Sequence, residues 1–391
     1  MTDQFTYVIL GAGRQGTAAA YDLVCAAKAS KVILADMDMD AASQATVRVN
    51  HLCGSNQAEP AQVDVRDAAA LKRLLAGTNG CLSAVPYFFN LGITQAALES
   101  GVSMCDLGGN TDIARQQHGF NRQAKAAGIS IIPNCGQVPG MGTTLCVHAI
   151  ELLDEAEDVY MWDGGLPQEP RPPFNYLLTF HIAGLTNLYA EPGVFLRNWK
   201  LTKVPPMTEP ELVDFPPPIG PLEAFVTGGG TDTMPWTYEG KLRTLQNLTL
   251  RHPGHFAQLR AFYDLGLWEE QPIRLGGIEV SPREVFHSLF EPKVTFPNDK
   301  DLVIVRVRAH GKKDGREAES FVELIDYFDQ ETGFTAMERC SGWSAAIVLE
   351  MAAKGQTLRG AGGVEVMVPS RPFVEALNLR GLKVTEEVSI K

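Results

Sequence analysis

The sequence lacks the features that mark a protein for export, membrane insertion or nucleic-acid binding. None of its apolar runs approaches the length that a helix needs to cross a bilayer, and no run of basic residues occurs. Its first residues, Met-Thr-Asp-Gln, carry neither the charged nor the apolar part of a signal peptide. The net charge of −12 is unfavourable for binding nucleic acids or anionic membranes. We therefore expect a cytoplasmic protein with no nucleic-acid or membrane partner.

The seven cysteines show no pairing motif. No CxxC pair occurs, so the sequence indicates neither a zinc site nor a redox dithiol. In a protein that is not exported we expect reduced thiols. Cys135 has no identifiable activating base, and we interpret it as a buried, inert thiol. The pair His252 and His255 lacks an acidic or thiol partner at ligand spacing, so we expect no metal site.

A glycine-rich turn near the N-terminus organises the first half of the chain. The apolar run 7–10 predicts a buried strand, the segment GAGRQG (11–16) a tight turn, and the run 17–24 a helix. This order is typical of a dinucleotide-binding domain, in which the helix N-terminus faces a pyrophosphate. Gly11 makes the turn, Gly13 removes a side chain that would block the phosphates, and Gly16 lets helix and strand pack closely. The alternative is an ordinary α/β domain with a chance glycine turn.

Asp36 bears on which dinucleotide binds. It ends a second predicted strand (31–35), about twenty residues after the last glycine, where a ribose-binding acid belongs. A carboxylate there can accept hydrogen bonds from both ribose hydroxyls and would repel a 2′-phosphate. Residues 37–40 contain no arginine or lysine to hold that phosphate. The sequence therefore favours NAD over NADP.

Strands and helices continue to alternate after Asp36, which predicts a parallel sheet. Strands are expected at 62–65, 80–87, 102–107 and 129–133, and helices at 68–75, 90–100 and 121–127. We predict a Rossmann domain over residues 1–141, with ligands at the carboxyl edge of its sheet. The predicted cofactor-binding residues are Gly11, Gly13, Arg14, Gln15, Gly16, Asp36, Asp64, Val65, Ser83, Ala84, Val85 and Leu107.

Residues 142–343 differ from the first region in predicted secondary structure, because strands dominate from Val159 onward. Segments 171–181 and 224–227 alternate or run apolar, and the runs 302–309 and 320–327, joined by a turn at 312–315, predict a hairpin. We expect a mixed-sheet α+β catalytic and dimerisation domain. A helix should begin near Ser344, as its N-cap, and run to Gly355. The segment 344–391 is expected to return and pack on the Rossmann domain.

Three loops, 83–87, 106–110 and 134–141, should converge at the carboxyl edge, where the nicotinamide would lie. Asp106 is the first candidate for a proton-handling acid, and the alternative is a carboxylate that caps a neighbouring helix. Tyr87 either walls the pocket or fills the core. Gln137, in the third loop, is a candidate substrate-binding residue.

The stretch 249–255, Thr-Leu-Arg-His-Pro-Gly-His, stands out in the second region. Burying Arg251, His252 and His255 around a Pro-Gly turn is costly unless they have a function, and Arg251 could hold a carboxylate with two hydrogen bonds. Arg243 is a second candidate for that role, and the glycine-rich loop 228–232 could be a flexible cover. The alternative is a solvated basic rim with satisfied histidines.

These motifs together resemble the saccharopine dehydrogenase superfamily and, within it, most closely the lysine 6-dehydrogenases (lysine ε-dehydrogenases). The resemblance covers nearly the whole chain and rests on GAGRQG, DLGGNTD (106–112), NCGQVPGM (134–141), GGLP (164–167) and TLRHPGH (249–255). It implies a Rossmann domain joined to a mixed-sheet catalytic domain, and a homodimer or larger homo-oligomer. It also implies NAD-dependent oxidative deamination of L-lysine at the ε-carbon, which gives ammonia, NADH and a semialdehyde that cyclises.

The resemblance leaves alternatives open. Saccharopine reductases and carboxynorspermidine-type dehydrogenases share much of the pattern but act on secondary amines and usually favour NADP, from which Asp36 departs. A non-catalytic NAD-binding regulator is a third possibility, against which the stretch 251–255 argues. For the lysine reaction, Arg243 or Arg251 would hold the α-carboxylate, and Asp106 would stabilise the developing iminium.

Overall fold

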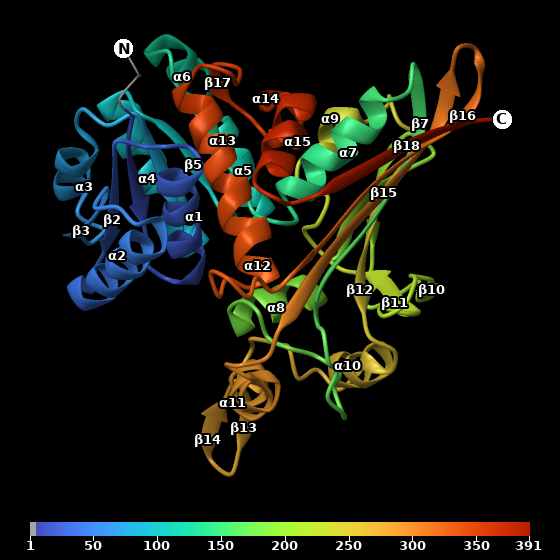
Figure 1. Cartoon of the computed structure of the whole chain (residues 1–391). Helices are drawn as coiled ribbons and strands as arrows, with labels where there is room; N and C mark the ends of the chain where they lie inside the picture. Colours follow the sequence, from blue (N-terminus) through green and yellow to red (C-terminus); the bar gives the residue numbers. More distant parts are fainter. Residues whose placement is uncertain (1–4) are drawn as a thin grey trace.

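Two large sheets, one parallel and one mixed, form the protein (Figure 1). The computed structural model describes residues 5–391. No helix in this range is both long enough and apolar enough to cross a membrane.

The first sheet is the predicted Rossmann sheet, and the fold class is confirmed. Its strand order is β17-β6-β5-β4-β1-β2-β3, and every pairing is parallel. Its strands are β1 (Thr6–Leu10), β2 (Lys31–Asp36), β3 (Ala58–Gln62), β4 (Gly80–Ser83), β5 (Ser103–Asp106), β6 (Ser130–Ile132) and β17 (Gly360–Ala361). Its helices are α1 (Arg14–Cys25), α2 (Met39–Cys53), α3 (Ala68–Leu75), η1 (Tyr87–Phe89), α4 (Asn90–Ser100), α5 (Thr111–His118) and α6 (Asn121–Ala127).

The third strand does not lie where the sequence predicted it. β3 spans Ala58–Gln62, whereas the prediction was 62–65. It is an edge strand, so it can include Pro60 and polar residues without a continuous apolar run. An apolar criterion therefore misses it.

The C-terminal segment returns to the Rossmann domain as predicted. Helix α13 (Ser344–Ala353) packs on β4, β5 and α1, so closely that a Cβ on Gly80 would lie 2.8 Å from Leu349 Cδ1 (Figure 1). β17 then extends the sheet beside β6. The chain continues through α14 (Val364–Met367) and α15 (Ser370–Leu379), and β18 (Val384–Ile390) joins the second sheet beside β16. Ser344 is not an N-cap, because α12 and the π-helical turn η2 run directly into α13.

The second sheet is mixed, with the order β10-β11-β12-β7-β15-β16-β18 and with β8 and β9 attached beside β12. The pair β12–β7 is parallel, and the predicted hairpin β15–β16 is confirmed. The strands are β7 (Glu155–Pro167), β8 (Gly193–Arg197), β9 (Lys200–Val204), β10 (Glu211–Val213), β11 (Leu222–Val226), β12 (Thr244–Arg251), β15 (Asp301–Lys313) and β16 (Arg316–Tyr327); a separate small hairpin contains β13 (Ile273–Leu275) and β14 (Ile278–Val280). The helices of this region are α7 (Met141–Glu151), α8 (Ile182–Ala190), α9 (Met234–Tyr238), α10 (His255–Asp264), α11 (Pro282–Val294), α12 (Ala336–Glu338) and η2 (Arg339–Trp343).

The expected strand at 171–181 is wrong, because this segment is irregular. It is apolar because Tyr176 and Leu178 pack in a buried cluster with residues of α8, α10 and α11. Burial beneath helices therefore explains an apolar pattern that suggested a strand.

One face of the second sheet is covered by α7 and ends in polar residues. Met161 lies under α7, where a Cβ on Gly142 would be 2.9 Å from its sulfur. Two residues further along β7, Asp163 is in register with Thr249 of β12 and Val305 of β15. Because side chains alternate along a strand, Asp163 points to the same face as Met161. The apolar face beneath α7 thus becomes polar toward the carboxyl ends of β7 and β12.

The cysteines depart from the expected all-reduced state. Cys25 at the end of α1 and Cys53 at the end of α2 form a disulfide, with a Cα–Cα distance of 5.5 Å. Their separation of 28 residues contains no pairing motif, so only the packing of the two helices brings them together. The five other cysteines, Cys135 among them, are free and buried.

Candidate active site

The glycine turn has the geometry that a dinucleotide requires. A Cβ on Gly11, whose φ is +102°, would lie 2.7 Å from the Ala84 carbonyl oxygen, and one on Gly16 would lie 1.9 Å from that of Gly11. By contrast, a Cβ on Gly13 would meet no heavy atom within 4 Å. Tight packing fixes the first and last glycines, and the middle one leaves the N-terminus of α1 open to a phosphate.

Asp36 is held beside this turn at the end of β2. Its Oδ2 accepts a hydrogen bond of 2.8 Å from the Ala12 N–H, and its Oδ1 accepts one of 3.0 Å from Asp38. The side chain is half-buried. A fixed, partly exposed carboxylate at this point suits the ribose hydroxyls of a dinucleotide.

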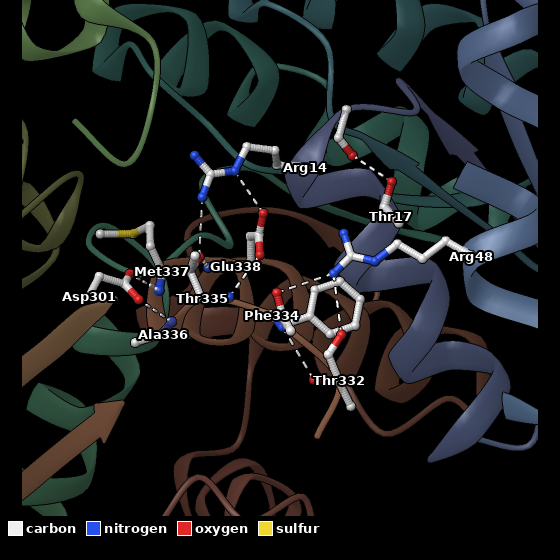
Figure 2. A network of polar contacts seen from close by, with 12 residues as sticks. Arg14, Thr17, Arg48, Asp301, Thr332, Phe334, Thr335, Ala336, Met337 and Glu338 are labelled. Carbon is white, nitrogen blue, oxygen red and sulfur yellow. Dashed lines mark hydrogen bonds and ion pairs between the residues drawn. The ribbon is translucent and has the colours of Figure 1, made fainter. Parts of the chain in front are cut away.

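Arg14 turns away from the glycine turn, toward the second half of the chain. Figure 2 shows its guanidinium reaching Glu338, with Nε 2.7 Å from Oε1. The other oxygen of Glu338 accepts from the Thr335 N–H, and Asp301 accepts from Ala336 and Met337 (Figure 2). The Arg14 side chain therefore joins the Rossmann domain to α12. Its contact with a cofactor stays a prediction.

The remaining predicted cofactor residues lie in three places. Ser83, Ala84, Val85 and Leu107 lie at the strand ends beside the turn; the Ala84 N–H donates to Leu10, and that of Leu107 donates to Ser83. Asp64 and Val65 follow β3 toward the surface, and an ion pair with Arg66 lowers the pKa of Asp64 to about 2. Gln15 lies in the first turn of α1, and its buried Oε1 has no hydrogen-bond partner within residues 5–391.

Asp106 accepts hydrogen bonds on both carboxylate oxygens and holds two loops, and its catalytic role stays a prediction. Its Oδ1 accepts from the backbone N–H groups of Gly108 and Asn134, both at 2.9 Å, and its Oδ2 accepts from Gln117 at 2.8 Å. Burial raises the pKa of this carboxyl, and the three hydrogen bonds oppose that rise. With both oxygens accepting hydrogen bonds from the protein, Asp106 fixes the loops after β5 and β6.

Tyr87 lies at the rim of the same loops. Its ring covers Gly109, where a Cβ would be 2.9 Å from Cδ1 of the tyrosine. The side chain is half-buried on η1, so it packs against the loop that Asp106 holds. Its catalytic role stays a prediction.

Arg251 and His255 meet in a buried chain of hydrogen bonds. Arg251, 3% exposed, donates from Nε to the Tyr189 hydroxyl at 2.7 Å, and its guanidinium lies against the rings of Tyr176 and Tyr189. His255 lies 3.0 Å from the Phe174 carbonyl through Nδ1 and 2.9 Å from the Tyr189 hydroxyl through Nε2. A carbonyl can only accept, so Nδ1 carries the proton and Nε2 accepts from tyrosine. Burial, and then the charge of Arg251, lower the pKa of His255 to about 3, which keeps it neutral.

Asp163 lies beside this chain and was not predicted from the sequence. Its Oδ1 accepts from Asn247 at 2.7 Å, whereas its Oδ2 is 3.4 Å from the amide nitrogen of Gln137. Burial raises its pKa to about 7, and the charge of Arg251 and the Gln137 contact oppose the rise. Gln137, a predicted substrate-binding residue, thus lies beside Asp163, and its contact with a substrate stays a prediction. A charged residue within the apolar strand 159–167 was the available signal for Asp163.

Arg243 and His252 have structural partners. Arg243 is at the opposite end of β12 from Arg251, its side chain is 44% exposed, and it pairs with Asp158 and Glu157. That Arg243 binds substrate stays a prediction, although acids of β7 already pair with its guanidinium at the surface. His252 lies 2.9 Å from the Pro167 carbonyl through Nε2, which ties the ends of β12 and β7 together.

The glycine-rich loop 228–232 is packed, not a flexible cover. A Cβ on Gly230 would lie 2.8 Å from the Asn247 side chain, and Asp232 is 2% exposed. Asp232 accepts from the Asn134 side-chain amide at 2.6 Å. This loop therefore connects the Arg251 cluster to the carboxyl edge of the Rossmann sheet. Within residues 5–391, no cluster of three or more His, Cys, Asp or Glu side chains is arranged to hold a metal.

Comparison with known families agrees with this architecture. Residues 7–132 match the saccharopine dehydrogenase NADP binding domain, and residues 136–382 match the saccharopine dehydrogenase C-terminal domain. The two family models together cover most of the chain.

Known relatives are distant. Saccharopine dehydrogenase [NADP(+), L-glutamate-forming] of Pyricularia oryzae is 25% identical over 255 residues, which is 62% of this chain and 54% of the relative. Carboxynorspermidine synthase of Vibrio cholerae is 24% identical over 318 residues, or 73% of this chain and 70% of the relative. The chain also spans 64% of the Saccharomyces cerevisiae saccharopine dehydrogenase, to which it is 21% identical.

A solved structure confirms the fold over nearly the full chain. The apo saccharopine dehydrogenase (L-Glu forming) from Saccharomyces cerevisiae aligns with a TM-score of 0.76. The alignment covers 98% of this chain and 100% of the yeast chain at 17% sequence identity. At that identity the likeness concerns the fold.

Proposed function

Because the chain belongs to the saccharopine dehydrogenase family, we propose that it is an NAD-dependent L-lysine 6-dehydrogenase. The reaction oxidises the ε-carbon of lysine, the imine hydrolyses, ammonia leaves, and 2-aminoadipate semialdehyde cyclises to piperideine carboxylate. Membership of this family supports an oxidoreductase that acts on an amino-acid substrate.

One observation carries the choice of substrate: Arg251 is a buried arginine without an ion pair. The other largely buried arginines, Arg306, Arg339 and Arg380, each pair with a carboxylate. Within residues 5–391, Arg251 forms no ion pair and lies instead against tyrosine rings. A buried cation of this kind is ready for one carboxylate of a ligand. Lysine carries one carboxylate, whereas saccharopine carries several.

The neighbours of Arg251 suit the rest of an amino-acid head group. Asp163, adjacent in the same cluster, can pair with the α-ammonium of lysine while Arg251 holds its carboxylate. The Tyr176 hydroxyl and the Asn247 Oδ1 are buried and have no hydrogen-bond partner in the described part of the chain. They add a donor and an acceptor for a polar ligand.

The glycine turn and Asp36 support NAD as the cofactor, which supplies the hydride acceptor when it is bound. The printed names of the fungal relatives specify NADP(+), but residues 37–40 of this chain lack a cation for a 2′-phosphate. We predict that NAD binds at least tenfold more tightly than NADP, a difference of about 1.4 kcal/mol. Asp36→Ala should reduce this difference in affinity, because it removes the repulsion between the carboxylate and the 2′-phosphate of NADP. Calorimetric titration measures both constants, and equal or tighter NADP binding would overturn the cofactor assignment.

The substrate is tested by a screen of L-lysine and saccharopine with each cofactor. We expect NADH formation and ammonia release with lysine and NAD. Turnover of saccharopine alone would replace the proposal with a secondary-amine dehydrogenase, and no turnover with either amine would favour a non-catalytic NAD-binding protein. We also propose that the protein is cytoplasmic and a homodimer or larger homo-oligomer, the latter measurable by light scattering.

A further inference from the structure

Among the buried carboxyl groups outside the substrate cluster, those of Asp232 and Glu365 combine two features: within residues 5–391 neither forms an ion pair, and each has one oxygen without a hydrogen-bond partner. Asp232 ends the loop 228–232, and Glu365 comes from α14 in the returning C-terminal segment; they are 2% and 7% exposed. One oxygen of each is held: Asp232 Oδ1 by Asn134, and Glu365 Oε1 by the hydroxyls of Thr233 and Thr237, both at 2.8 Å. Their other oxygens, Oδ2 and Oε2, are buried without a hydrogen-bond partner within residues 5–391. Leaving buried carboxyl oxygens unpartnered costs free energy, which indicates a group that acts on something else.

The position of Asp232 places it between the two halves of the candidate site. Its partner Asn134 follows β6 at the carboxyl edge of the Rossmann sheet, and a Cβ on Gly108 would lie 2.1 Å from the Asn134 Oδ1. This edge is where a nicotinamide would lie. On its other side, the loop that carries Asp232 packs on Asn247, which donates to Asp163. A substrate held by Arg251 and Asp163 would extend its far end toward Asp232.

The charges around Asp232 make it a strong base for a carboxylate. Burial raises its pKa well above the usual range, the negative charge of Glu365 raises it further, and the Asn134 hydrogen bond opposes the rise. Asp106 adds a smaller repulsion. The other titratable groups that face this pair are the buried Cys135 thiol and the Tyr238 hydroxyl, and burial raises the pKa of both.

We propose that Asp232 is the base that accepts the proton of the reacting ammonium group, and that Glu365 is a positioning residue that keeps Asp232 basic. The inference rests on the proposed amine oxidation. One N–H bond of the ε-ammonium breaks, the proton goes to Asp232 Oδ2, and the electron pair stays on nitrogen. The Cε–H bond then breaks, its electron pair passes as hydride to the nicotinamide ring, and the nitrogen lone pair forms the C=N bond. Water adds to this iminium and ammonia leaves.

Two isosteric substitutions test the assignment, because each retains the hydrogen bonds described above. In Asp232→Asn, Oδ1 can still accept from Asn134, and in Glu365→Gln, Oε1 can still accept from both threonines. Asp232→Asn should lower kcat/KM for the amine about a hundredfold or more, the usual contribution of a general base. Glu365→Gln should retain activity but move the acidic limb of the pH profile of kcat/KM down by about one pH unit, since it removes a like charge.

A matched control and two further readouts separate chemistry from folding. Asp22→Asn removes a buried carboxylate elsewhere, one that pairs with Arg380, and should leave the acidic limb in place. NAD affinity and the melting temperature should be unchanged in Asp232→Asn. An active Asp232→Asn, or an unmoved limb in Glu365→Gln, would overturn this inference while leaving the proposed function intact. A wild-type protein that oxidises no amine would overturn both.

Discussion

Asp106 and Asp163 are buried carboxyl groups in the two sheets of the molecule, and they differ in how completely they are partnered. Asp106 ends β5 and accepts three hydrogen bonds of 2.8–2.9 Å from its own domain. Asp163, near the end of β7, has one short hydrogen bond, from Asn247, and a 3.4 Å contact with Gln137. Burial raises the pKa of both. The two carboxyl groups are therefore alike in burial and differ in how many hydrogen bonds the protein supplies to them.

The arginines at the two ends of β12 show the same difference in partnering. Arg243, at the start of the strand, pairs with acids of β7 at the surface. Arg251, at its end, is buried against two tyrosines without an ion pair in the described chain. One end of the strand thus carries an arginine with acidic partners, and the other end carries the arginine that we propose for the ligand carboxylate. Substitutions at the four positions can test the distinction.

The largest effect is expected from Asp163→Asn, which should stabilise the protein while lowering activity. The folded-state pKa of Asp163 is raised to about 7 from 3.8, so the folded state retains its proton where the unfolded chain has lost it. The contribution of the Asp163 carboxyl group to the free energy of unfolding therefore falls as pH rises from about 4 to 7. The asparagine side chain does not ionise, so the variant avoids this fall. We expect a gain of about 2–4 kcal/mol in the free energy of unfolding at pH 8, and little gain near pH 4. Denaturant titrations at both pH values measure it; destabilisation at pH 8 would contradict the interpretation.

Arg251→Met should have the next largest effect, on lysine but not on its decarboxylated analogue, cadaverine. Methionine retains much of the volume and removes the charge, so the contact with the α-carboxylate is lost. A charge-assisted contact contributes roughly 1.5–3 kcal/mol, or about ten- to a hundredfold in kcat/KM for lysine. The kcat/KM for cadaverine, which we expect to be low in the wild type, should change little in the variant. Arg243→Ala is the matched control and should leave both amines unaffected. Equal losses on both amines in Arg251→Met would make Arg251 structural.

Asp106→Asn should have the smallest effect, and its sign should be opposite to that of Asp163→Asn. An amide at this position places donor hydrogens against donors of Gln117 or of the backbone. We expect a loss of about 1–2 kcal/mol in the free energy of unfolding, the cost of an unsatisfied buried group. Thermal or denaturant unfolding at pH 7 measures it. A stabilised Asp106→Asn would remove the contrast between the two carboxyl groups.

Local patterns allowed the architecture, but not the chemistry, to be predicted from the sequence. Helices α3, α4 and α6 coincide with the predicted ranges, because capping residues and apolar periodicity are local signals. The polar edge strand β3 and the apolar but irregular segment 171–181 were misjudged, since burial there depends on other elements.

The candidate site was harder to predict for the same reason. Asp106 has partners from two other segments, and Arg243 and Arg251 look alike until β7 supplies acids to only one of them. Asp163 and Asp232 became candidates only when distant loops were seen to leave oxygens incompletely partnered. The disulfide between Cys25 and Cys53 likewise depends on helix packing.

A crystal structure of the protein with NADH and L-lysine tests the central claim most directly, because the reduced cofactor prevents turnover. We predict that the lysine carboxylate lies within hydrogen-bond distance of the Arg251 guanidinium, its α-ammonium beside Asp163, and its ε-amine beside Asp232 Oδ2. A lysine whose carboxylate is held elsewhere, with Arg251 still enclosed by Tyr176 and Tyr189, would contradict it.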